Sequence, residues 1–212
     1  MAMSTVLGCI KQADIDYNLI QDGDRIAIGI SGGKDSMVLA LAMSLYQRFS
    51  KKDYQIVAIH ITMGFEENNF EEVESFFKEK GIEYHVVPSK PMIYEVLKRN
   101  LTNNGKLPCS ICSKMKKAAI NKVANELGFN KVAFAHHADD AIETLFMNEI
   151  YGGRVATFAP KMHLERANIT FIRPFSLVRE KDIVSLIKEE NLPVMLPKDV
   201  DFSVVGKSPI TT

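Results

Sequence analysis

Short apolar runs alternate along the chain with longer stretches in which apolar residues recur every three or four positions. The runs are rich in Val, Ile, Phe and Tyr, a composition that favours β-strands, and they cover residues 25–30, 55–62, 82–87, 131–135 and 169–172. The stretches between them have the spacing of amphipathic helices, for example at Val73, Phe76 and Phe77. This alternation predicts an α/β fold with a doubly wound, mainly parallel five-stranded sheet and helices on both faces.

Two segments near the amino terminus have their own apolar pattern. Residues 36–46 are apolar almost all round, which predicts a helix buried against the sheet. Residues 4–20 are expected to form a helix before the first strand, and its apolar face would carry Val6, Ile10, Ala13 and Tyr17.

Three stretches, residues 101–108, 151–167 and those from 197 onward, show neither pattern and are expected to form loops. The sequence contains no repeat, low-complexity tract or Gly/Ser linker. We therefore expect residues 1–212 to form a single domain, with residues 1–20 as an N-terminal helical extension.

Composition and charge limit the classes of function. With 212 residues and 46% hydrophobic content, the chain can bury one substantial core. The longest stretch without a charged residue, 36–47, is shorter than the roughly 18 residues that a membrane span needs, and the amino terminus lacks signal-peptide features, so we expect a cytoplasmic protein that contacts no membrane. Lys plus Arg and Asp plus Glu both number 26, so RNA binding would need a local basic patch.

The hexapeptide Ser-Gly-Gly-Lys-Asp-Ser follows the first predicted strand and precedes a predicted helix, at residues 31–36. Glycines in such a turn permit positive φ and a close approach of ligand to backbone N–H groups. The helix N-terminus adds partial positive charge and Lys34 adds a full charge, so the turn suits a pyrophosphate group. The spacing excludes a Walker loop, because Ile28 and Asp35 stand where that pattern needs Gly and Ser or Thr. Gly-Ile-Ser at 29–31 likewise departs from the Rossmann pattern.

A second group of polar residues follows the fourth predicted strand. His136 and His137 come directly after it, and Asp139, Asp140 and Glu143 lie at the start of the next helix. Carboxylates at this position also serve as helix caps and dipole partners. Because the carboxyl ends of parallel strands meet at one sheet edge, we expect this group to lie near the phosphate loop.

Two thiols stand at metal-ligand spacing in Cys109-Ser-Ile-Cys112, where a helix is expected to begin. A helix N-terminus lowers a thiol pKa, so the pair is either half of a metal site or a redox or persulfide pair. The basic residues that follow form either a solvated helix face or a patch for RNA phosphates; they are Lys114, Lys116 and Lys117, to which Lys122 and Arg154 would add.

The hexapeptide resembles the PP-loop of the ATP pyrophosphatase superfamily, whose members bind ATP, release pyrophosphate and leave AMP on an acceptor oxygen. The resemblance implies an adenine nucleotide alpha hydrolase-like three-layer fold, with ATP and Mg²⁺. It implies that Lys34 and Asp35 manage charge and metal, and that His136, His137 and Asp140 also serve the site. The residues that it implies around the phosphates are Ser31, Gly32, Gly33 and Ser36.

Further segments extend the resemblance, over nearly the whole chain, to the TtcA family of tRNA 2-thiocytidine synthetases. They are QDGDRI at 21–26, CSICS at 109–113, HHADD at 136–140, YGGR at 151–154, APK at 159–161, IRPF at 172–175 and REKDI at 179–183. The family implies adenylation of the C2 oxygen of a cytidine in the tRNA anticodon loop and its replacement by sulfur. It also implies a sulfur donor such as a cysteine desulfurase, a homodimer, and catalytic roles for Lys34, Asp35, Cys109, Cys112 and Asp140.

The resemblance further implies a [4Fe-4S] cluster held by three cysteines, of which Cys109 and Cys112 match the first two. The third has no counterpart, since no cysteine follows Cys112 and the spacing of Cys9 on its helix predicts a core residue. The alternatives are a persulfide on Cys109 or Cys112, or a cluster or zinc ion completed by other ligands. Ala138 and Glu143-Thr144 are closer to tRNA lysidine synthetase, which uses an amine nucleophile. A non-catalytic ATP-binding subunit is the third possibility.

Overall fold

The computed structural model describes residues 2–62, 70–88 and 109–193, with the backbone alone at 109–114. Its sheet has the strand order β3-β2-β1-β4-β6-β5, and all neighbouring pairs are parallel except β5 with β6. The bounds are Asp24–Ile30 for β1, Tyr54–Thr62 for β2, Tyr84–Pro88 for β3, Lys131–Ala133 for β4, Lys161–Leu164 for β5 and Ile169–Ile172 for β6. The predicted α/β class and mainly parallel sheet are confirmed.

The predicted number of strands is wrong by one. β5 lies within residues 151–167, which were expected to form a loop, and a short 3-10 turn at Glu165–Ala167 connects it to β6. As an edge strand that pairs with β6 alone, β5 is largely exposed on both faces, and its sequence Lys-Met-His-Leu lacks the apolar run of a buried strand. The two other predicted loops, residues 101–108 and the tail from 197, lie outside the described residues.

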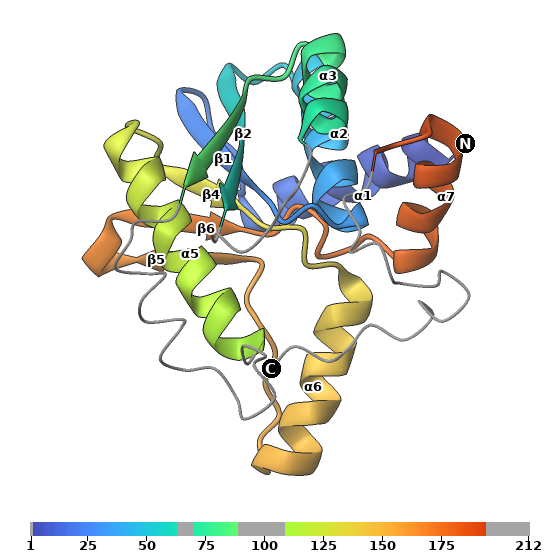
Figure 1. Cartoon of the computed structure of the whole chain (residues 1–212). Helices are drawn as coiled ribbons and strands as arrows, with labels where there is room; N and C mark the ends of the chain where they lie inside the picture. The colour runs from blue at the N-terminus through green and yellow to red at the C-terminus, as the bar shows by residue number, and fades with distance from the viewer. Residues whose placement is uncertain (1, 63–69, 89–108, 194–212) are drawn as a thin grey trace, which may run out of the picture.

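The helices divide between the two faces of the sheet (Figure 1). Those described are α1 (Ala2–Tyr17), α2 (Lys34–Phe49), α3 (Glu71–Lys80), α5 (Cys109–Glu126), α6 (Ala138–Gly152) and α7 (Glu180–Glu190). Buried residues of α1, α2, α3 and α7 form one apolar cluster with the sheet, and α5 forms a second cluster on the opposite face. β1 shows the alternation directly, because Ile26, Ile28 and Ile30 join the first cluster while Ala27 joins the second.

Two details of this packing could not be read from composition. α1 is part of the core, because Val6, Ile10 and Ala13 on its predicted apolar face are fully buried, although Tyr17 is exposed. Gly29 gives α5 room to approach β1, because a Cβ there would lie 3.0 Å from Cδ1 of Ile120. The assignment of residues 1–212 to one domain stays a prediction.

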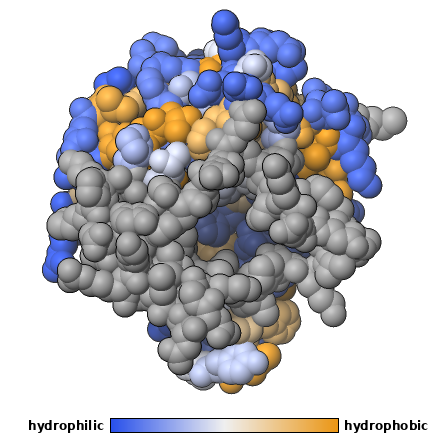
Figure 2. Space-filling view, viewed as in Figure 1, coloured by the Kyte–Doolittle hydropathy of each residue, from blue (hydrophilic) through white to orange (hydrophobic). Residues whose placement is uncertain are grey.

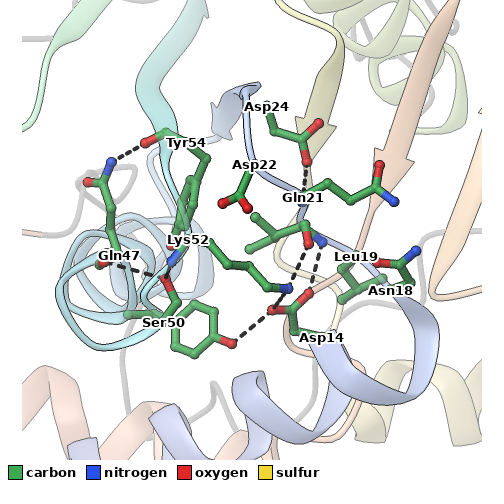
Figure 3. A network of polar contacts seen from close by, with 12 residues as sticks. Asp14, Asn18, Leu19, Gln21, Asp22, Asp24, Gln47, Ser50, Lys52 and Tyr54 are labelled. Carbon is green, nitrogen blue, oxygen red and sulfur yellow. Dashed lines mark hydrogen bonds and ion pairs between the residues drawn. The ribbon is translucent and has the colours of Figure 1, made fainter.

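A buried carboxylate, Asp14, connects α1 to the segment before β2 (Figure 3). One of its oxygens accepts from the Ile20 amide at 2.9 Å, and the other accepts from the Tyr46 hydroxyl at 2.8 Å and from Lys52 Nζ at 2.6 Å. Burial, with the neighbouring Asp14 charge, raises the pKa of Tyr46 well above its usual value, so the hydroxyl stays a donor. This network fixes the amino-terminal edge of the sheet.

A second buried ion pair at that edge joins β1 to β4. Asp24 and Lys131 are the first residues of these strands, their side chains are 5% and 6% exposed, and Lys131 Nζ lies 2.5 Å from Asp24 Oδ2. Lys131 also donates to the Leu19 carbonyl, and Asn130 donates to the second carboxylate oxygen of Asp24. The pair therefore sets the register on which the far ends of both strands depend.

α6 differs from the other described helices because it buries no residue. It extends away from the sheet in Figure 1, and apolar surface appears at that end of the molecule in Figure 2. Its exposed apolar side chains repeat every four residues, at Ile142, Phe146 and Ile150. None of the helices in the described ranges is both long and apolar enough to span a bilayer.

Replacing Asp24 with alanine should destabilise the fold by about 3–5 kcal/mol, because it leaves the buried ammonium group of Lys131 without its counter-charge. The free energy of unfolding, measured in urea, checks this. Glu79→Ala is the control, because it removes an exposed partner of Lys80 and should cost about 1 kcal/mol or less. Equal urea midpoints for Asp24→Ala and Glu79→Ala would contradict the claim that the buried Asp24–Lys131 pair stabilises the fold.

Candidate active site

The phosphate loop lies where the strand order of the sheet reverses. β1 has β2 on one side and β4 on the other, so the segments that leave their carboxyl ends diverge there. Ligands of open α/β sheets bind at such a switch point. Ser31, Gly32 and Gly33 follow β1 at this place, and His136 and His137 follow β4 beside them. The predicted proximity of the two groups is confirmed by the pairing of Ile28 with Ala133.

Hydrogen bonds within the loop hold its shape. Gly32 has a φ of +86°, a conformation that side chains disfavour. The Ser36 hydroxyl donates to the Gly33 carbonyl at 2.9 Å and accepts from the Ser31 amide at 3.2 Å, while the Ser31 hydroxyl accepts from the Gly33 amide at 3.2 Å. Ser36 is buried and Ser31 is exposed, so Ser31 is the hydroxyl open to a ligand.

The amino terminus of α2 is open to an anion. Gly33 is its N-cap and has no side chain to accept from the first turn. Those N–H groups and the positive end of the helix dipole therefore face the loop without a capping acceptor. A phosphate group is the ligand that such an arrangement favours.

Lys34 stands between two carboxylates at this terminus. Its Nζ lies 3.2 Å from Asp35 Oδ1 and 2.9 Å from Glu180 Oε1, an oxygen contributed by the first residue of α7. Burial lowers the pKa of Lys34, but Asp35 and Glu180 outweigh it, so the pKa is raised above its usual value. Lys34 is therefore a permanent cation beside the loop.

One oxygen of Asp35 is available to a cation. Asp35 Oδ1 is buried and accepts no hydrogen bond within the described residues, although it lies in the electrostatic reach of Lys34. Lys34 Nζ, at 3.2 Å, offsets part of the cost of burying this oxygen, and a bound cation would offset the rest. Mg²⁺ binds proteins through one or two carboxylates together with substrate phosphates, so Asp35 fits such an ion.

His137 and Asp140 cap α6. The Asp140 carboxylate accepts from the His137 amide at 2.8 Å, and His137 Nδ1 accepts from the Asp140 amide at 3.4 Å, which completes a capping box. Burial raises the pKa of Asp140, and the charges of Asp35 and Glu180 add to this against the opposing effect of His137. Asp140 therefore lies near the acidic side of the phosphate loop, and its catalytic role stays a prediction.

Asp139 connects α6 to the start of α7. Its carboxylate accepts from the Glu180 amide at 2.7 Å and from Arg179 Nε at 3.1 Å. Burial acts to raise the pKa of Asp139, but these two donors prevail and hold it below its usual value. Asp139 thus positions Glu180, and through it Lys34, whereas Glu143 on the same helix is exposed.

His136 turns away from this group. Its ring lies 6.0 Å from the ring of Phe134 and 5.2 Å from that of Phe158. Burial, with the nearby charges of Arg173 and Lys117, lowers the pKa of His136 to about 3, so the ring is neutral. From the sequence, both histidines were expected to serve the ATP site. In the structure His137 caps α6, whereas His136 lies among aromatic rings and the cations Arg173 and Lys117.

The three cysteines of the sequence lie on helices that cover opposite faces of the sheet, Cys9 on α1 and the other two on α5. Cys109 and Cys112 lie in the first turns of α5, and their side chains are outside the described part. Cys9 packs against the apolar cluster of the opposite sheet face, as its spacing predicts, and burial and Asp182 raise the pKa of its thiol. Among the described residues, no group of three or more His, Cys, Asp or Glu side chains is placed to hold a metal ion. A set of three cysteines from this sequence therefore does not fit.

Sequence reasoning gave no role to two residues that the structure brings to this edge. Glu180 is the second partner of Lys34, and Arg173 is buried beside His136. Both stand in segments that carry the family resemblance, IRPF and REKDI. Their place in these segments was the one sign in the sequence that they serve the site. What each residue contacts is seen only in the folded structure.

Replacing Asp139 with alanine should cost about 1 kcal/mol of stability at neutral pH, because the Glu180 amide loses its acceptor. A carboxyl whose folded pKa is lowered stabilises the fold above its unfolded pKa and loses that effect when the folded carboxyl is protonated. The difference in the free energy of unfolding between the variant and wild type should therefore narrow as pH falls below 3.8, the usual pKa of an aspartate. Urea unfolding from pH 7 to pH 3 measures it. Glu143→Ala is the matched control, and a difference for Asp139→Ala that is constant with pH would refute the account.

Comparison with known proteins identifies the family. Residues 9–195 match the PP-loop domain family. A tRNA-cytidine(32) 2-sulfurtransferase of Geobacter sulfurreducens is 33% identical over 190 residues, which cover 90% of this chain and 73% of that protein. The protein of the same name from Delftia acidovorans is 35% identical over 189 residues, covering 88% of this chain and 58% of its own length. The chain thus spans less than two thirds of the Delftia protein.

Solved structures share the fold. A U34-tRNA thiolase, NcsA of Methanococcus maripaludis, described with its [4Fe-4S] cluster, superimposes with a TM-score of 0.73 at 22% identity, covering 95% of this chain and 68% of that one. An NH3-dependent NAD synthetase of Campylobacter jejuni gives a TM-score of 0.55 at 15% identity, covering 91% and 75%. These likenesses confirm the adenine nucleotide alpha hydrolase-like fold. The family match and the relatives more than 30% identical show that the chain belongs to the PP-loop family and, within it, to the family of tRNA-cytidine(32) 2-sulfurtransferases.

Proposed function

We propose that this chain uses ATP to activate a carbonyl oxygen of a cytidine in tRNA and replaces that oxygen with sulfur. The observation that carries the proposal is the phosphate loop itself, an uncapped helix terminus with Lys34 beside it at the switch point of a parallel sheet. The curated relatives, which are tRNA-cytidine(32) 2-sulfurtransferases, support cytidine as the base and tRNA as the substrate.

ATP binding is assigned to the loop. The Gly32-Gly33 turn and the first-turn amides of α2 bind the β- and γ-phosphates, and Ser31 offers the exposed hydroxyl. Asp35 is the residue that would hold Mg²⁺, through its buried Oδ1. When bound, the ion neutralises charge on the departing pyrophosphate.

The first chemical step is adenylation. The base oxygen attacks the α-phosphorus of ATP, the bond to the bridging oxygen breaks, and pyrophosphate leaves. Lys34 and the loop amides stabilise the charge that develops on pyrophosphate, and they need no reorganisation because Asp35 and Glu180 already hold the ammonium group in place. The oxygen is thereby converted into part of AMP, which is a good leaving group.

The second step transfers sulfur and is assigned to Cys109 and Cys112. A persulfide on one cysteine attacks the activated carbon with its outer sulfur, and AMP leaves. The thiolate of the other cysteine then attacks the inner sulfur, which releases the thiolated base and forms a disulfide that an external dithiol reduces. The start of α5 favours the thiolate form that both attacks require. Because the chain's own cysteines do not complete a cluster site, no step is assigned to a cluster.

The amine nucleophile and the non-catalytic subunit are the competing readings. An enzyme of the first kind would adenylate RNA without needing either cysteine, and a subunit of the second kind would bind ATP without releasing pyrophosphate. The sulfur donor and the homodimer stay predictions from the family resemblance. Zinc stays a prediction from the spacing of Cys109 and Cys112.

Lys34→Ala should lower the rate of tRNA-dependent exchange between ATP and pyrophosphate by about 10²-fold, because one preorganised cation at the leaving group is lost. Exchange of labelled pyrophosphate into ATP measures this. Lys188→Ala, at an exposed position of α7, should leave the rate unchanged. Exchange by the Lys34 variant at the wild-type rate would remove this lysine from the reaction.

Cys109→Ser and Cys112→Ser should each abolish formation of the thiolated nucleoside while tRNA-dependent pyrophosphate release continues. Mass spectrometry of nucleosides from treated tRNA gives the first readout, and a pyrophosphate assay gives the second. Cys9→Ser is the matched control and should retain thiolation, because Cys9 packs against the core. If the wild-type protein modifies tRNA without adding sulfur, an amine nucleophile is favoured. If thiolation survives the loss of both cysteines, the sulfur comes from another source.

A further inference from the structure

Two cations that pair with no carboxylate among the described residues lie together beyond the carboxyl ends of β4 and β6. Arg173 directly follows β6, and Lys117 projects from α5. Each lies over an aromatic ring: the guanidinium carbon of Arg173 is 4.9 Å from the centre of the Phe158 ring, and Lys117 Nζ is 5.8 Å from that of Phe134. His136 contacts both rings and connects the two halves of the group.

Arg173 is deeply buried, although no carboxylate in the described part of the chain pairs with it. Only 6% of its surface is exposed. One of its terminal nitrogens donates to the Ala159 carbonyl, but Nε is buried and has no hydrogen-bond partner within the described residues. Desolvation lowers the pKa of Arg173, although the guanidinium stays charged at any physiological pH.

Lys117 and His136 do not compensate this charge. Burial lowers the pKa of Lys117, and the charge of Arg173 lowers it further. His136 is neutral, and its Nδ1 is buried without a partner in the described structure. The group therefore contains two positive charges and two unused polar atoms in an apolar setting.

Three other lysines that are buried or half-buried have carboxylate partners. Lys131 has Asp24 at 2.5 Å, Lys52 has Asp14 at 2.6 Å, and Lys34 has two carboxylates. Holding the buried charge of Arg173 beside a second, half-buried cation, with no anion among the described residues, costs several kcal/mol. A bound anion removes that cost, so the group is built for a ligand that carries negative charge.

We propose that Lys117 and Arg173 form a phosphate-binding site that is separate from the phosphate loop, and that its ligand is a phosphodiester of the RNA next to the base that reacts. The guanidinium offers paired donors to a phosphate, Lys117 adds a point charge, and Phe158 and neutral His136 provide faces on which a base can stack. Because Lys117 lies eight residues after Cys109 on α5, the site is about 12 Å along the helix from the first cysteine.

This inference rests on the proposed function, which identifies the RNA as tRNA. A phosphate at this site could belong either to RNA or to a nucleotide such as ATP. The phosphate loop already accounts for nucleotide phosphates, which favours RNA here. Of the basic residues that the sequence suggested for RNA, Lys117 turns inward to this site, whereas Lys122 is paired with Glu126 on the exposed side of α5.

The test measures binding of an anticodon stem-loop RNA by fluorescence anisotropy at several salt concentrations, and binding of ATP by calorimetry. Lys117→Gln should weaken RNA binding about tenfold and reduce the slope of log affinity against log salt by about one, with ATP binding unchanged. Lys117→Arg should restore most of the affinity. Lys11→Gln, at an exposed position of α1, is the control for loss of one charge.

Weaker ATP binding with unchanged RNA binding would assign the site to the nucleotide and overturn the RNA assignment. Unchanged binding of both ligands, in a variant whose thermal unfolding shows it folded, would mean that the cations are structural and would overturn the site. Arg173→Gln is measured in the same way, and Lys117→Gln keeps the test valid if that variant does not fold. Neither the RNA-binding nor the ATP-binding measurement requires the enzyme to complete its reaction. A protein that binds RNA through Lys117 without thiolating it would therefore refute the proposed function but not this site.

Discussion

The parallel pairing of β1 with β4 is the constraint on which the site depends. It places the ends of two strands that are far apart in sequence side by side, with Ile28 opposite Ala133. The buried pair of Asp24 and Lys131 fixes this register from the opposite edge of the sheet. Strand order reverses at the same place, so the phosphate loop and the residues after β4 lie at the same edge of the sheet. A shift of one residue in this register would turn the residues that follow β4 to the wrong face.

The two histidines after β4 show how one short segment serves both faces of the sheet. His137 closes a capping box with Asp140 on the side of α2 and α7, where Lys34, Asp35 and Glu180 meet. The preceding His136 lies with aromatic rings on the side of α5. Under the proposed function, nucleotide chemistry belongs to the side of α2 and α7, and sulfur and RNA chemistry to the side of α5.

Most of the fold could be predicted because its strands are buried apolar runs and its helices have regular periodicity. β5 was missed because an edge strand needs no apolar run, and the exposure of Ile142 and Phe146 on α6 was invisible because periodicity does not show what covers a face. The phosphate loop was predictable from local spacing. The Lys34–Glu180 pair and the Arg173 group were not, since they join residues from separate elements whose approach only the packed structure determines.

The central claim is that the Gly32-Gly33 turn and the start of α2 bind the triphosphate of ATP. A crystal structure of the protein with a non-hydrolysable ATP analogue tests it most directly. The account predicts phosphate oxygens within hydrogen-bond distance of the loop amides, with Lys34 directed to them and Asp35 beside the bound cation. A triphosphate lodged elsewhere, at Lys117 and Arg173 for example, with the loop empty, would contradict it.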